Sequence, residues 1–168
     1  MRTVTATTTI DDLDDFLAEI EAISEATGAT VQCFDADYVA GDRHLRRAVE
    51  LAARAREQGT AVADDPAVEI LLYAAGRRQI NQALEMGVSE GDADVVSVVT
   101  GGDEAAAEQR VRKLLGATDA SHDGDGSTLG DEDTIRTFFD IGDAELAVVD
   151  GDLEDIVIER VALLDVEK

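Results

Sequence analysis

The side chains in this sequence that are best suited to binding chemistry lie near its centre. Arg77 and Arg78 are adjacent, and Gln79, Asn81 and Gln82 follow directly. Guanidinium and amide groups form directional hydrogen bonds, and a guanidinium can present parallel N–H donors to a phosphate or a carboxylate. The pattern therefore predicts a surface that binds anions or other polar groups.

A second set of arginines precedes this pair. Arg43, Arg47 and Arg54 stand at helical spacing with Glu50 among them, so all four side chains share one outer face of a helix. Two interpretations stay open: an exposed face that Glu50 partly neutralises, or a strip that binds anions. His44 falls at the edge of the apolar side of the same helix, where a histidine more often forms a boundary hydrogen bond than acts as a ligand or base.

The charge distribution separates the centre from the rest of the chain. The 168 residues carry a net charge of −24. Residues 41–82 contain seven arginines and six acidic residues, a net charge of +1, whereas the remaining residues carry −25. Acid spread over a whole chain resembles the proteins of salt-in halophilic archaea, so the total charge does not exclude a nucleic-acid partner. The local balance marks the centre as the candidate surface.

Motifs for catalysis are missing from the sequence. It has no glycine-rich phosphate loop, no paired His/Cys spacing and no nucleophile motif. Asp42 and His44 are two residues apart on a helix, so their side chains diverge. Cys33 is the single cysteine, and we expect it to be a small packing residue on a strand. We expect no catalytic residue, no cofactor and no metal site, and we interpret the chain as a binding protein.

Two helical segments are expected to position the central arginines. Asp65 and Pro66 suit the start of the first segment, and Gly76 suits its end. The second segment runs to Gly87, and helical spacing predicts a buried apolar stripe along it, formed by Ile80, Ala83 and Leu84. Its polar face is predicted to carry Arg78, Asn81, Gln82 and Glu85.

The whole chain is predicted to be a single domain of the α+β class, covering residues 1–168. We expect a mixed, mostly antiparallel sheet of about four to five strands flanked by helices, with strands near residues 2–8, 29–34, 60–63 and 94–100. A polar loop is expected at 117–130 and a last amphipathic helix at 152–165. The sequence shows no transmembrane stretch and no signal segment, and we expect a cytoplasmic protein that does not bind a membrane.

Two parts of the sequence together resemble a known family. The first is Gly41, His44 and Leu45, which form a Gly-x-x-His-Leu pattern, and the second is the run from Glu69 to Ile80, Glu-Ile-Leu-Leu-Tyr-Ala-Ala-Gly-Arg-Arg-Gln-Ile. The combination resembles the kinase-binding subunit of the KEOPS (EKC) complex, the family of the human PRPK-binding protein. Residues 28 to 100 carry most of the resemblance.

The resemblance implies a non-catalytic subunit. Such a subunit docks on an atypical kinase/ATPase of the PRPK type, meets other KEOPS subunits indirectly, and helps recruit tRNA by its 3′ CCA end for threonylcarbamoyladenosine synthesis. On this hypothesis the candidate tRNA-binding residues are Arg43, His44, Arg47, Tyr73, Arg77, Arg78, Gln79 and Asn81. The alternative is a pure protein-interaction subunit. In that case the centre has few acidic residues because it packs on the kinase, with arginines at the rim of the interface.

Overall fold

The computed structural model describes residues 1–117, 130–149 and 151–167. The chain divides into two compact units, one containing residues 1–36 and 87–125 and the other residues 37–86 and 126–168. All eight candidate tRNA-binding residues belong to the second unit. Most of the predicted polar loop at 117–130 lies outside the described residues, and the expectation of one domain over residues 1–168 stays a prediction.

The first unit is built on an antiparallel sheet. Its strands are β1 (Arg2–Ile10), β2 (Thr30–Asp35) and β3 (Gly91–Thr100), in the order β1-β3-β2. Ser97 of the central strand is opposite Val4 on one side and Cys33 on the other. Valine and threonine dominate these segments, and β-branched side chains suit the pleated, half-buried surface of a sheet. The strand predictions at 2–8, 29–34 and 94–100 are confirmed.

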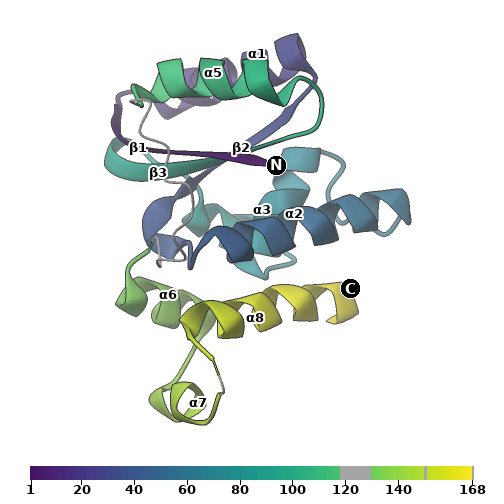
Figure 1. Ribbon diagram of the computed structural model, residues 1–168, viewed down its shortest axis with the longest axis vertical. Coiled ribbons are helices and arrows are strands. Elements are labelled where there is room, and N and C mark those ends of the chain that lie inside the picture. The colour runs from purple at the N-terminus through teal and green to yellow at the C-terminus, as the bar shows by residue number, and fades with distance from the viewer. Residues whose placement is uncertain (118–129, 150, 168) are drawn as a thin grey trace. The chain divides into compact units, whose positions relative to one another are not determined.

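Two helices cover one face of this sheet, α1 (Leu13–Thr27) and α5 (Glu104–Leu115) (Figure 1). Their apolar stripes pack with Val4, Val31, Val95 and Val99 of the sheet in one mainly aliphatic core. Cys33 lies in that core, with its Sγ 2.7 Å from Ser97 Oγ, and burial raises the pKa of the thiol to about 11. The predicted role of Cys33 as a packing residue agrees with this environment.

The predicted strand count is too high for the described residues. They form three strands, all antiparallel, and residues 60–63 are irregular. The physical reason lies in the side chain of Glu69, whose carboxylate accepts hydrogen bonds from Val62 N at 3.2 Å and Ala63 N at 2.8 Å. Backbone donors that pair with a side chain are not available to a strand ladder. The α+β class itself is confirmed.

The second unit is helical. It contains α2 (Asp42–Glu57), α3 (Pro66–Ala75), α4 (Ile80–Ala83), a 3-10 turn η2 (Leu84–Met86), α6 (Glu132–Phe139), α7 (Asp143–Val148) and α8 (Leu153–Glu167). Another 3-10 turn, η1 (Ala36–Tyr38), precedes α2. Helices α2, α3 and α8 pack against one another, and α6 packs on α8 (Figure 1). Across the described residues, no helix has both the length and the apolar character that spanning a membrane requires.

Candidate interaction surface

The first turn of α2 is capped by a side chain from α8. Gly41 occupies the N-cap position, where it provides no side-chain hydrogen bond. Instead, Glu154 Oε1 accepts a hydrogen bond from His44 N at 3.1 Å, and Glu154 Oε2 pairs with Arg43 Nη2 at 3.1 Å. The helix dipole favours a carboxylate at this end. Glu154 therefore joins the start of α8 to the start of α2.

The space beside Gly41 is occupied by the carboxylate of Glu154. A β-carbon added there lies 2.5 Å from Glu154 Oε1, whereas the φ angle of 164° is ordinary extended backbone. We expect Gly41→Ala to lower the free energy of unfolding by about 1–3 kcal/mol, because the carboxylate must move and leave the buried His44 amide unpaired. Urea unfolding measures this loss. In a Glu154→Ala background the cost of Gly41→Ala should nearly vanish, and an equal cost in both backgrounds contradicts the explanation.

His44 is fully buried and bridges two segments of the second unit. Its Nδ1 accepts a hydrogen bond from Ala40 N at 3.1 Å, so Nε2 carries the proton and donates to Ala74 O at 2.8 Å. The ring meets Phe139 edge-on, with centroids 5.7 Å apart. Burial lowers the pKa of His44 to about 4. The sequence correctly indicates a hydrogen-bonding histidine. However, the side chain is buried inside the unit, so in this conformation it does not reach a surface at which RNA could bind.

Tyr73 is also part of the interior. Its hydroxyl donates to Asp165 Oδ1 at 2.8 Å, and Arg54 Nη2 pairs with Asp165 Oδ2 at 2.8 Å. The ring is fully buried, and burial raises the pKa of the hydroxyl. Tyr73 thus joins α3 to α8. Neither Tyr73 nor His44 presents its ring to solvent in this conformation.

The arginines on the outer face of α2 are paired with the chain's own carboxylates. Arg43 Nη1 lies 2.9 Å from Asp155 Oδ1, and Arg47 Nη1 lies 3.4 Å from Glu50 Oε2. Arg54 pairs with Asp165, as described above. Exposed pairs of this kind contribute little stability, but they neutralise the cations. Of the two interpretations left open by the sequence, the geometry favours the neutralised face.

The adjacent arginines 77 and 78 have different environments. The guanidinium of Arg77 lies over the ring of Phe138, 4.9 Å from its centroid, and donates a hydrogen bond to Phe138 O. Arg77 therefore attaches the turn after α3 to α6. Arg78 is exposed and forms no hydrogen bond or ion pair with the described residues. Of the two, Arg78 is the one available to a partner.

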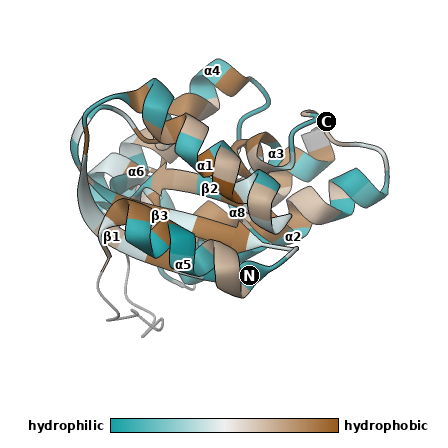
Figure 2. Ribbon diagram, turned by 90° about the horizontal axis from the view of Figure 1, so that it is seen from above, coloured by the Kyte–Doolittle hydropathy of each residue, from teal (hydrophilic) through white to brown (hydrophobic). Residues whose placement is uncertain are grey.

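Arg78 belongs to an exposed patch, here called the α4 surface, that combines polar and apolar side chains. Gln79 and Asn81 are exposed beside it. Ile80 is 49% exposed and Leu84 is 56% exposed, and the two lie one helical turn apart. The α4 surface consists of Arg78, Gln79, Ile80, Asn81 and Leu84, and the α4 ribbon accordingly carries both hydrophilic and hydrophobic colours (Figure 2).

The predicted buried stripe of this segment is wrong in two of its three residues. Ala83 is buried, as expected, but Ile80 and Leu84 are exposed and Met86 is buried instead. The reason is that α4 ends at Ala83 and continues as the 3-10 turn η2, in which side chains three residues apart align. Ala83 and Met86 have that spacing.

The residues that carry the family resemblance therefore divide into two groups. Gly41, His44, Glu69 and Tyr73 hold the second unit together, whereas Arg78 and its neighbours reach solvent. A family model described as kinase binding protein CGI-121 matches residues 8–165 of the chain. The chain belongs to the CGI-121 family.

Membership of the CGI-121 family confirms the predicted family and makes a kinase the expected protein partner. The match covers both units, including the buried framework and the α4 surface. None of the curated proteins compared with the chain matches it. The functional assignment therefore depends on the family and on the geometry of the second unit.

Proposed function

We propose that this CGI-121 family member is a non-catalytic subunit of a KEOPS complex. In this role it binds the atypical kinase/ATPase subunit and recruits tRNA by the 3′ CCA end for threonylcarbamoyladenosine synthesis in the cytoplasm. The proposed tRNA binding rests on one observation, the exposure of Arg78. This side chain forms no ion pair with the described residues and lies beside the exposed amides of Gln79 and Asn81.

The chemistry of the α4 surface suits a single-stranded RNA end. Unpaired bases are held by stacking and by hydrogen bonds to their edges, as well as through their phosphates. A guanidinium can stack on a base or bind a phosphate, and amide groups both donate and accept hydrogen bonds. Directional contacts of this kind lose less affinity in concentrated salt than a purely electrostatic site. They are compatible with a chain whose net charge is −24.

The direct test is binding of the purified protein, in molar KCl, to a full-length tRNA and to the same tRNA lacking its CCA end. The proposal expects binding to the intact tRNA and a large loss on trimming. Equal binding to both molecules indicates non-specific contact and contradicts recruitment by the 3′ end. Binding to neither removes the RNA role and leaves kinase docking.

Replacement of Arg78 tests the assigned surface. We expect Arg78→Ala to weaken tRNA binding by about tenfold, equivalent to about 1.4 kcal/mol, which is the usual worth of one stacking or bidentate contact. The matched control is Arg110→Ala, because Arg110 of α5 is also exposed and unpaired among the described residues. Circular dichroism should show unchanged folds. Equal effects of both substitutions, or no effect of either, contradict the assignment.

The alternative function is kinase docking without RNA contact, and one observation favours it. Ile80 and Leu84 expose apolar side chains on the α4 surface, with Arg78 at the edge, an arrangement typical of a protein interface with an arginine rim. On this alternative, replacing Ile80 and Leu84 by serine weakens kinase binding, and Arg78→Ala weakens it too without a separate RNA defect. Kinase affinity and tRNA affinity, measured on the same variants, distinguish the two functions.

A further inference from the structure

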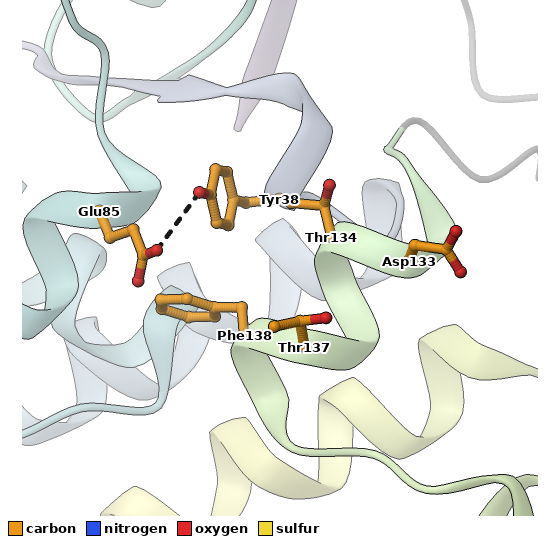
Figure 3. A pocket seen from close by; sticks show the side chains of 6 residues that line it. All are labelled: Tyr38, Glu85, Asp133, Thr134, Thr137 and Phe138. Carbon is orange, nitrogen blue, oxygen red and sulfur yellow. Dashed lines mark hydrogen bonds between the residues drawn. The ribbon is translucent and has the colours of Figure 1, made fainter.

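A hollow of about 330 Å³ lies in the second unit, and its lining residues differ from those of the α4 surface, although Glu85 directly follows Leu84 in the sequence. It is lined by Tyr38 of η1, Glu85 of η2, and four residues of α6: Asp133, Thr134, Thr137 and Phe138. In the close-up the ring of Tyr38 lies above that of Phe138, with Glu85 at one end and Asp133 at the far end, its carboxylate directed away from the rings (Figure 3). This volume is at the lower end of the range for small-molecule pockets, and it suits one side chain.

The aromatic walls of the hollow are held in place by their neighbours. The rings of Tyr38 and Phe138 are nearly perpendicular, at 84°, with centroids 5.4 Å apart. Phe138 also meets Phe139 edge-on at 5.0 Å and carries the guanidinium of Arg77 over its ring. The hollow is therefore a formed feature, and Arg77 shows that a cation is compatible with the ring of Phe138.

The charged groups that line the hollow are both acidic. Glu85 is exposed and accepts a long hydrogen bond of 3.5 Å from the Tyr38 hydroxyl. Asp133 is exposed, and none of the described residues donates a hydrogen bond to its carboxylate. No basic side chain is among the lining residues. Carboxylates beside aromatic rings favour a cation that has a hydrophobic stem.

We propose that this hollow receives a lysine or arginine side chain from a protein partner. The stem packs against Tyr38 and Phe138, and the cationic head reaches the carboxylates of Glu85 or Asp133. An arginine inserted into a formed pocket is a common energetic centre of protein interfaces. The residues that line the hollow are not among those proposed to bind tRNA. An experiment can therefore contradict this proposal without contradicting the proposed tRNA binding, and the reverse.

The test is an NMR titration at the lowest KCl concentration at which the protein stays folded. The probe is N-acetyl-arginine N-methylamide, compared with the corresponding citrulline derivative, which has the same shape without the charge. We expect the arginine probe to shift the backbone amides of Glu85, Thr134 and Thr137, and the citrulline probe to leave them unchanged. The double variant Glu85→Gln/Asp133→Asn should bind the arginine probe about fivefold more weakly.

A matched control separates the hollow from general acidity. Glu132 is exposed on α6 but does not line the hollow, so Glu132→Gln should leave binding of the arginine probe unchanged. Equal shifts by the citrulline probe, or an equal loss with Glu132→Gln, overturn the proposal. Tighter binding of free arginine or spermidine than of the blocked residue also overturns it, because the site is then one for a small molecule.

Discussion

Glu69→Ala is expected to lower the free energy of unfolding by about 3 kcal/mol. The Glu69 side chain is fully buried, and its two carboxylate oxygens accept from Val62 N and Ala63 N at 3.2 and 2.8 Å. Hydrogen bonds to a charged group contribute about 1.5–3 kcal/mol each. Alanine removes both acceptors and leaves a cavity between α3 and the loop that precedes it.

Urea unfolding gives the stability loss, and hydrogen exchange gives its location. The amides of Val62 and Ala63 should lose protection in Glu69→Ala beyond the change expected from global stability. Glu69→Gln should fall between the wild type and Glu69→Ala, because its amide keeps one acceptor oxygen. The matched control is Glu159→Ala on the exposed side of α8, which should change stability by less than about 0.5 kcal/mol. A loss in Glu69→Ala no larger than in this control contradicts the role.

Helices and strands were largely predictable because their signals are local. Asp65 accepts from Ala67 N and Val68 N at the start of α3, and Gly76 ends that helix in the left-handed conformation, as the sequence indicates. The strand expected at 60–63 does not form, because the backbone amides of Val62 and Ala63 donate to the buried side chain of Glu69, several residues later. A pattern of alternating apolar residues contains no information about such a competitor.

The division of the central motif into buried and exposed residues was not predictable from spacing. At position 41 a side chain would meet the carboxylate of Glu154, a residue that is more than a hundred positions away in the sequence and adjacent in space. Tyr73 is hydrogen-bonded to Asp165, which is similarly distant. Side chains that can bind RNA can also form hydrogen bonds and ion pairs with other residues of the same chain. The tertiary packing determines which of these partners is available to each side chain. Arg77 and Arg78 show this most clearly, because Arg77 contacts Phe138 whereas its neighbour Arg78 is exposed.

The stability of the protein is expected to fall between pH 6.5 and pH 4, because His44 must stay neutral in the fold. Burial lowers its pKa to about 4 from an ordinary value of 6.5. Between these values the unfolded chain binds the proton and the folded chain does not, so the free energy of unfolding rises with pH. The stabilisation is fully present above the unfolded pKa and is lost as pH falls towards the folded one. Its full size is about 3 kcal/mol.

Urea unfolding at several pH values measures this effect, and the window from pH 6.5 to pH 5 isolates it. Carboxylates whose pKa values are lowered by their partners, such as Glu108 and Asp155, lose their contribution at lower pH, when they become protonated. His44→Asn removes the titrating group, so its stability should be lower but nearly constant through this window. In the wild type, the Hε1 chemical shift of His44 should not titrate above pH 5. A His44 that titrates near pH 6.5 in the folded protein contradicts the buried, neutral ring, because its Nδ1 is then free to take a proton instead of accepting from Ala40 N.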